Sequence, residues 1–300
     1  MTEKGPSKFG IITSCYGRGL PVEDAVQRLH KIGFRDLELP CWHLTEGHDA
    51  GSYLKGNLSP RLKALRDRLS DLGMTVRQFH STHALRAESE SARAEAADWI
   101  RRTIEVAEEA GARALILHIG GKKANCADRT DREIFDANAK TLSELADFAK
   151  PLKIRLAIEN LMSDVNRQGC RIAELKELIE AVGSDRIGIC LDTGHANVDG
   201  LDVSDAIREC GPLLCATHIQ ETCPGNDLHV FPLNLRRSKS TMDWFRIFRT
   251  FQETGYPFPL IGECSNNTGE LPLPMVDEYL KTQRFLIESV LQHQFEAPEG

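Results

Sequence analysis

Residues 186–197 read RIGICLDTGHAN, and this stretch shows in miniature how the chain is built. A short apolar run leads directly into Asp192, and His195 follows three residues later. Such a run, bounded by polar residues, is typical of a strand that is buried on both faces of a parallel sheet. Asp192 has two interpretations, as the N-cap of a following helix or as a metal ligand with His195 beside it. The residues at the ends of the other expected strands distinguish these two interpretations.

The same pattern recurs along the chain, where short apolar runs alternate with long amphipathic segments. The expected strands span 9–15, 34–40, 74–80, 113–118, 154–160, 186–192, 213–218 and 258–263. The expected helices span 21–32, 59–72, 88–111, 131–149, 172–182, 203–210, 242–254 and 274–293, with a long loop between residue 218 and the helix at 242. Eight such units close most simply into a (β/α)8 TIM barrel with its active site at the C-terminal mouth of the strands. The structural alternative is a doubly wound open sheet, but Gly17 and Gly19 lack the third glycine of its usual fingerprint.

Composition narrows the class of protein. The 300 residues, 41% of them hydrophobic, suit a single domain over 1–300. Nine scattered cysteines without a C-x-x-C pair indicate reduced thiols, and the polar start MTEKGPSKFG has no apolar signal core, so we expect a cytoplasmic protein. No apolar run approaches the length of a membrane span. The net charge of -7 disfavours a nucleic-acid partner unless basic residues are clustered.

Ionisable residues stand at the ends of six consecutive expected strands: His80, His118, Glu159, Asp192, His218 and Glu263. Each one alone has a structural interpretation, as a satisfied histidine or a helix cap. Burying six of them at one rim without a cation would cost several kcal/mol each. Carboxylates together with imidazoles suit Mn²⁺ or Zn²⁺, and also Co²⁺ or Mg²⁺. The pattern therefore predicts a divalent metal site.

Three further residues extend this set. His195 follows Asp192, and the loop after the seventh strand contains Asp227 and His229 in a D-x-H spacing that projects both side chains to one side. Together they could hold a second cation or the hydroxyls of a substrate. D-x-H is also common in loops without any such role, so both interpretations stay open.

Several motifs together make the chain resemble the xylose isomerase-like barrel superfamily. They are LILHIGG (115–121), LAIEN (156–160), CLDTGHAN (190–197), THI (217–219) and NDLHVFP (226–232). The superfamily groups sugar and sugar-phosphate isomerases and epimerases with endonuclease IV. The resemblance implies a metal held by Glu159, Asp192, His218 and Glu263. It also implies that Glu159 and Glu263 are the catalytic acid–base pair, moving a proton through a metal-stabilised enediolate.

The resemblance leaves the chemistry open. The stretch HIQETCPG (218–225) lacks the arginine that usually follows the strand-seven histidine of ketose 3-epimerases. Endonuclease IV relatives use nine ligands to three zinc ions, and all nine are matched in type: His80, His118, Glu159, Asp192, His195, His218, Asp227, His229 and Glu263. An endonuclease IV-like zinc phosphodiesterase acting on abasic DNA is therefore an alternative. An inosose-dehydratase-like lyase and a catalytically silent binding protein are two others.

Further residues near the mouth also have expected roles. Trp42 could close over a sugar ring, Arg167 could grip a phosphate or carboxylate, Glu38 is expected to make a structural hydrogen bond inside the barrel, and Asn160 to orient Glu159. Two basic clusters could hold a sugar phosphate or a nucleic acid: Lys122 and Lys123, and Arg236, Arg237 and Lys239. We expect a metal-dependent isomerase or epimerase of a small sugar, sugar phosphate or polyol derivative, forming a homodimer or homotetramer, and no nucleic-acid partner.

Overall fold

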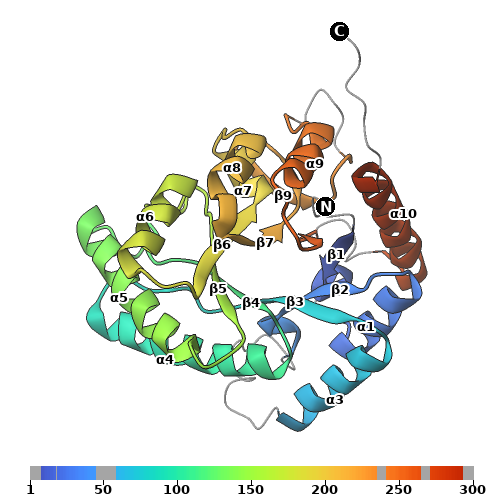
Figure 1. The fold of residues 1–300 in the computed structure, drawn as a ribbon, viewed down its shortest axis with the longest axis horizontal. Coiled ribbons are helices and arrows are strands. Elements are labelled where there is room, and N and C mark those ends of the chain that lie inside the picture. Colours follow the sequence, from blue (N-terminus) through green and yellow to red (C-terminus); the bar gives the residue numbers. More distant parts are fainter. Residues whose placement is uncertain (1–7, 18, 45–58, 235–240, 265–270, 293–300) are drawn as a thin grey trace.

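An eight-stranded parallel sheet forms the centre of the molecule in the computed structural model, which describes residues 8–17, 19–44, 59–234, 241–264 and 271–292 (Figure 1). Its strand order is β10-β1-β2-β3-β4-β5-β6-β7. The strands are β1 Phe9–Ile12, β2 Asp36–Pro40, β3 Thr75–His80, β4 Ala114–Leu117, β5 Arg155–Glu159, β6 Ile187–Asp192, β7 Leu214–His218 and β10 Leu260–Gly262. Each expected strand is therefore present.

The sheet closes on itself just beyond its two outer strands. The Ile219 N–H donates to the Ile261 carbonyl over 2.8 Å, and the Ile261 N–H donates to Thr217 Oγ1 over 3.0 Å. Ile219 also forms a parallel bridge with Gly262. These contacts join the end of β7 to β10, so the strands form a nearly closed barrel. The predicted (β/α)8 barrel is confirmed, and the open doubly wound sheet is excluded.

Helices surround the barrel (Figure 1). They are α1 Val22–Lys31, α3 Ser59–Asp71, α4 Glu90–Glu109, α5 Asp131–Ala149, α6 Ile172–Val182, α7 Thr193–Val198, α8 Val203–Cys210, α9 Trp244–Glu253 and α10 Leu273–Gln292, with short 3₁₀ helices at Thr13–Tyr16, Cys41–His43 and Gly211–Leu213. Local sequence explains several ends. A capping box of Thr130 and Glu133 starts α5, and Gly183 ends α6 in the left-handed conformation.

The structure differs from the sequence-based expectation in three places. Strand β1 ends at Ile12, and residues 13–16 form a 3₁₀ helix instead of extending the strand to residue 15. Helix α7 follows β6 directly, and its six residues are too few to show helical periodicity. The expected long loop after β7 contains an antiparallel hairpin of β8 Glu221–Cys223 and β9 Asn226–Val230, which was missed because its strands are so short.

Strand periodicity decides which side chains reach the barrel interior. A small cluster of Ala114, Ile116, Ala157, Cys190 and Ala216 packs inside. The intervening residues, such as Leu115, Ile158 and Leu191, belong to the larger core between the strands and the helices. Because side chains alternate along a strand, residues two positions beyond the interior cluster also point inward. His118, Glu159, Asp192 and His218 occupy those positions.

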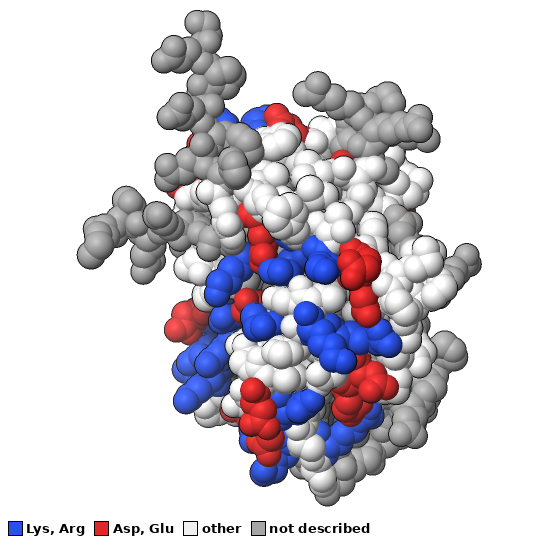
Figure 2. Space-filling view, turned by 90° about the vertical axis from the view of Figure 1, so that its right-hand side faces the viewer, with Lys and Arg blue, Asp and Glu red and all other residues white. Residues whose placement is uncertain are grey.

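The outer surface of the helices mixes both signs of charge. Figure 2 shows Lys and Arg interspersed with Asp and Glu on the face formed by α1, α3 and α10, the helices on the right-hand side of Figure 1. Arg28 pairs with Asp277 and Arg61 with Glu23 on these helices. Within the described ranges, no helix combines the length and apolar character needed to cross a membrane.

Gly10 on β1 allows its neighbours β2 and β10 to pack closely, and replacing it with alanine should destabilise the barrel. An added Cβ would meet the Asp36 carbonyl and the Ile261 side chain at distances that atoms do not tolerate. We expect Gly10→Ala to lower the free energy of unfolding by about 1–3 kcal/mol in urea denaturation. Gly19→Ala is the matched control, since nothing lies within 4 Å of its Cβ position. Equal stabilities of the two variants would contradict this packing.

Candidate metal centre

The six ionisable residues predicted at the strand ends lie together at the C-terminal mouth of the barrel. Glu159, Asp192 and His218 end the neighbouring strands β5, β6 and β7, and His80 ends β3. His118 and Glu263 follow β4 and β10 directly. The side chains of Glu159, Asp192 and His218 are at most 1% exposed, whereas that of Glu263 is 14% exposed. The His118 side chain is 35% exposed, so the cluster combines deeply buried members with members that solvent reaches.

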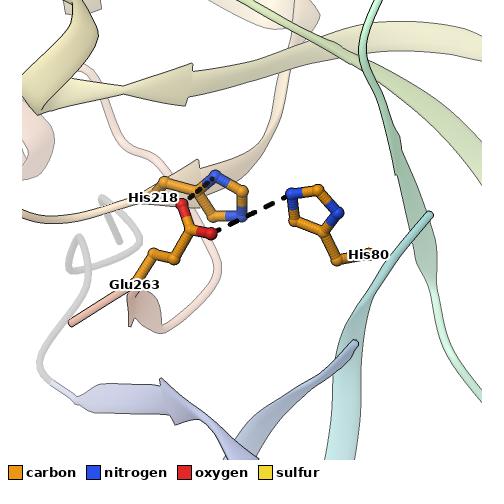
Figure 3. A group of neighbouring side chains, drawn as sticks. All are labelled: His80, His218 and Glu263. Atoms are coloured by element: carbon orange, nitrogen blue, oxygen red, sulfur yellow. Dashed lines mark ion pairs between the residues drawn. The ribbon is translucent and has the colours of Figure 1, made fainter. Parts of the chain in front are cut away.

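The imidazole of His218 occupies the middle of this cluster. Its Nδ1 lies 2.9 Å from Glu159 Oε1 and 3.1 Å from Glu263 Oε2. On the other side of the ring, Nε2 lies 2.8 Å from Glu38 Oε2. Figure 3 shows Glu263 reaching across toward both His218 and His80. Glu38 thus makes the hydrogen bond expected of it inside the barrel, and the same Oε2 has two partners, His218 and Gln78, whose Nε2 donates to it over 2.7 Å.

His80 and His118 form a second group with Glu159. His118 Nε2 lies 2.9 Å from Glu159 Oε2, and His80 Nε2 lies 3.8 Å from the same oxygen. His80 Nδ1 donates to the Ser81 carbonyl over 2.9 Å, so the proton is on Nδ1 and Nε2 is left as a ligand atom. The rings of His80 and His218 stack with 5.3 Å between their centroids. Glu159 is therefore shared by two neighbouring groups.

Asp192 turns out to be both an N-cap and a member of the cluster. Its Oδ1 accepts the His195 N–H over 2.7 Å and caps α7. Its Oδ2 lies 3.8 Å from His218 Nδ1. The His195 ring donates from Nδ1 to the Asn160 carbonyl over 2.9 Å, and its Nε2 faces Asp227. The two interpretations of Asp192 are thus compatible, because Oδ1 caps α7 while Oδ2 faces the His218 ring.

The β8–β9 hairpin brings Asp227 and His229 close to His195. This is the arrangement that a joint role of the three residues requires, whether they hold a second cation or the hydroxyls of a substrate. Asp227 Oδ2 lies 3.6 Å from His195 Nε2, and its Oδ1 lies 3.2 Å from His229 Nδ1. His229 Nε2 in turn lies 3.5 Å from Glu263 Oε2. The backbone of His229 has a φ of 49°, a left-handed conformation that is uncommon for residues other than glycine. This third group is continuous with the first through Glu263.

Charge compensation shifts the pKa values of these residues. Burial alone lowers the pKa of His218, but the carboxylates Glu263, Glu38 and Glu159 outweigh it and raise the pKa well above its usual value. Burial also lowers the pKa of His195, but Asp192 and Asp227 outweigh this effect and raise the pKa to about 10. Asp227 and Glu263 likewise outweigh burial at His229 and raise its pKa to about 11, so His218, His195 and His229 all favour the protonated form that balances the carboxylates when no cation is bound.

The pKa values of the two glutamates at the mouth shift in the opposite direction. Burial alone raises the pKa of Glu159, but His218 and His118 outweigh it and hold the pKa well below its usual value. Burial also opposes the change at Glu263, where His218 and His229 lower the pKa to about 2. Burial and the charge of Glu159 raise the pKa of Asp192. Both glutamates are consequently ionised at neutral pH, which is the state that binds a cation.

The donor set fits a divalent cation. Ligand atoms of Glu159, Asp192, His218 and Glu263 all lie within 4.8 Å of one another, and the same holds for three smaller groups. Those groups are His80, His118 and Glu159; His80, His218 and Glu263; and Asp192, His195 and His229. Mixed carboxylate and imidazole donors suit Zn²⁺ and Mn²⁺. A bound cation would also replace the protons that now balance the buried carboxylates.

Two amide side chains support the cluster. Gln220 Nε2 donates to both oxygens of Asp192, over 3.0 and 3.2 Å, and its Oε1 accepts the His229 N–H over 2.9 Å. Gln220 is not predicted from the sequence, since a single glutamine after a strand carries no signal. Gly194 leaves the space for it, because a Cβ there would collide with its side chain. Asn160 was expected to orient Glu159 but exchanges two hydrogen bonds with the backbone of Asp192 instead.

The two predicted substrate contacts differ in position. The Trp42 ring lies edge-on to His80 with 5.0 Å between centroids, so it borders the mouth. The Arg167 guanidinium donates to the carbonyls of Cys126 and Arg129 and pairs with Asp131 over 2.6 Å, so its donors hold the loop before α5. Of the two basic clusters, Lys122 and Lys123 are exposed, and residues 236–239 lie outside the described residues.

The chain is similar to several known proteins in sequence and in fold. Residues 26–288 match the family model described as Xylose isomerase-like TIM barrel. A D-psicose 3-epimerase of Agrobacterium fabrum is 26% identical over 257 residues, covering 81% of this chain and 79% of the epimerase. A probable endonuclease 4 of Mycoplasma genitalium is 36% identical over 103 residues, but covers only 34% of this chain and 33% of that protein. The crystal structure of the IOLI protein with a bound zinc atom superimposes with a TM-score of 0.72 at 15% identity, over 97% of this chain and all of that one.

Metal binding should release protons and become tighter as the pH rises. The raised pKa values of His218, His195 and His229 mean that these rings carry protons at neutral pH, and a cation has to displace them. Each proton released should increase the affinity for Zn²⁺ about tenfold per pH unit between about pH 6 and pH 8. Calorimetry in buffers of different ionisation enthalpy measures both quantities. An affinity that does not change with pH would contradict the protonated state.

Gln220→Met should weaken metal binding about 10–100-fold, because methionine fills the space but neither donates to Asp192 nor accepts from His229. The measurement is a competition titration with a chromogenic chelator. Gln27→Met, on helix α1, is the control and should bind metal like the unmodified protein. Unchanged affinity in Gln220→Met would show that Asp192 holds its orientation without this amide.

Proposed function

The chain belongs to the xylose isomerase-like TIM barrel family, and on that premise we propose that it is a divalent-metal-dependent isomerase or epimerase of a small sugar, sugar phosphate or polyol derivative. The similarity to a D-psicose 3-epimerase over most of both chains supports this class of reaction. Similarity to an endonuclease 4 is confined to about a third of the chain. The proposed substrate is a small carbohydrate, bound at the C-terminal mouth.

The observation that carries the proposal is the placement of two ionised glutamates around one imidazole. Glu159 Oε1 and Glu263 Oε2 lie 2.9 and 3.1 Å from the same His218 nitrogen, although they come from β5 and from the segment after β10. Isomerisation or epimerisation next to a carbonyl requires that a proton be removed and then returned. Two carboxylates that converge from different strands can share these two tasks. We assign the acid–base roles to Glu159 and Glu263.

Glu159, Asp192, His218 and Glu263 would hold the cation, for which Mn²⁺ and Zn²⁺ are the first choices and Co²⁺ and Mg²⁺ also suit the donors. When bound, such a cation polarises a substrate carbonyl and so favours loss of the neighbouring proton. The IOLI protein, whose fold this chain shares, binds a zinc atom, which supports a metal in this chain as well. Trp42, next to His80, offers an apolar ring surface on which a sugar could lie.

A second candidate function is metal-dependent hydrolysis of a phosphodiester, and one observation favours it. All nine residues that match the endonuclease IV ligands lie within one continuous network, in which Asp227 bridges His195 and His229. A site that holds more than one cation can stabilise both the attacking and the leaving oxygen of a phosphoryl transfer. In the described loops after β3 and β4, the exposed cations include Lys122, Lys123 and Arg86, and Arg86 is paired with Glu88, which leaves little positive charge for binding a duplex.

Hydrogen exchange separates the two functions. The Mn²⁺-loaded protein is incubated in D₂O with a panel of ketoses, ketose phosphates and inososes, and NMR follows deuterium entering next to the carbonyl. We expect exchange with at least one member of the panel. Glu263→Gln should slow it about 10²–10⁴-fold, because the amide cannot accept the proton.

Glu180→Gln, on the exposed side of α6, is the control and should exchange at the normal rate. Full exchange in Glu263→Gln would contradict the acid–base role. Cleavage of a duplex with an abasic site, in the absence of exchange into any ketose, would replace the isomerase proposal with the phosphodiesterase.

A further inference from the structure

A cavity lies at the opposite end of the barrel from the candidate metal centre, where the strands begin. Its volume is about 90 Å³. The lining residues are Arg77, Gln78, Arg113, Ala114, Arg155, Cys215, Tyr256, Phe258 and Pro259. Three of them are arginines, and none of these described lining residues is acidic. A cavity of this size and charge suits a small anion.

Backbone hydrogen bonds link the three arginines in sequence: Arg77 lies on β3, Arg113 directly precedes β4 and Arg155 begins β5. The Arg113 N–H donates to the Arg77 carbonyl over 3.2 Å, and the Arg155 N–H donates to the Arg113 carbonyl over 3.0 Å. Arg155 is in phase with Ala157 and Glu159 along β5, so its side chain starts toward the barrel interior. Backbone pairing therefore places the three arginines side by side at this end of the barrel, where all three line the cavity.

The positive charge of the cavity is only partly compensated. Arg77 Nε pairs with Asp36 over 2.6 Å, but within the described ranges neither Arg113 nor Arg155 takes part in an ion pair. Arg155 donates to the Ile187 carbonyl over 3.2 Å, whereas its Nε is buried without a hydrogen-bond partner. Leaving a buried donor unpaired is unfavourable. An anion in the cavity would satisfy it.

A glycine makes room for this arrangement. A Cβ on Gly188, which faces the interior on the neighbouring strand β6, would lie 2.8 Å from Arg155 Nε and 2.6 Å from the Cys215 sulfur. The absent side chain is the reason that Arg155 can lie across β6 at the base of the barrel. Any larger residue would push the guanidinium away from the cavity.

We propose that this cavity binds a small organic oxyanion, in which a carboxylate or phosphate group contacts Arg113 and Arg155. Guanidinium groups match the planar, bidentate geometry of such anions. Phe258, which is 41% exposed, packs edge-on against Tyr256 with 5.6 Å between ring centroids and forms an apolar wall. That wall suits a ligand with a short apolar or aromatic body. The site is independent of the metal centre and of the activity proposed for it.

Calorimetric titration of the metal-loaded protein with phenyl phosphate tests the proposal. We expect binding that weakens at high salt, and a loss of at least about tenfold in affinity in Arg113→Ala. Arg113 is exposed, so the variant should fold, which thermal unfolding checks. Arg132→Ala, on the outer surface of α5 with a side chain that is 78% exposed, is the matched control and should bind normally.

Two further titrations separate the parts of the ligand and its place of binding. Phe258→Ala should weaken phenyl phosphate about 3–10-fold and leave inorganic phosphate unchanged, because only the former has an apolar body. A benzoate titration shows whether a carboxylate serves as well as a phosphate. Equal binding to the unmodified protein and to Arg113→Ala would place the anion elsewhere and overturn the proposal, as would no binding at about 10 mM phenyl phosphate.

Discussion

The burial of the His218 imidazole among three carboxylates is the interaction on which the mouth of the barrel depends. Both ring nitrogens lie against carboxylate oxygens at 2.8 to 3.1 Å, and neither the ring nor Glu38 is exposed to solvent. At a site that excludes solvent, leaving one buried charge without its partner costs several kcal/mol of folding free energy. The ionised members of the cluster therefore hold one another in position. The same balance prepares the site for a cation, since a metal can take over the role of the protons.

The rest of the site is built outward from this balance. Asp192 divides its two oxygens between capping α7 and facing His218, so that one residue fixes both a helix and a ligand. Gln220 then ties Asp192 to the backbone of His229, and the β8–β9 hairpin brings Asp227 beside His195. Each of these contacts joins a segment outside the eight main strands to the residues at the strand ends.

The two ends of the barrel use charge in opposite ways. At the C-terminal mouth, carboxylates are concentrated and attract cations. At the start of the strands, Arg77, Arg113 and Arg155 surround a small cavity and attract anions. Both arrangements rest on parallel strands, whose backbone hydrogen bonds place residues of the same position in the unit side by side. A parallel barrel thus concentrates whatever charge its repeating units carry at each end.

The sequence by itself determined the barrel, the positions of its eight main strands and the residue type at each strand end, because periodicity and strand-end chemistry are local properties of the chain. It also placed Asp227 and His229 near His195 as one of two open interpretations. Only the tertiary structure decided that His218 contacts Glu38, 180 positions away, that Asn160 supports Asp192 and not Glu159, and that Gln220 belongs to the site. Short elements such as α7 and the β8–β9 hairpin were also missed. The physical reason is that such contacts depend on how distant strands align and on the space left by residues such as Gly194, which no local pattern records.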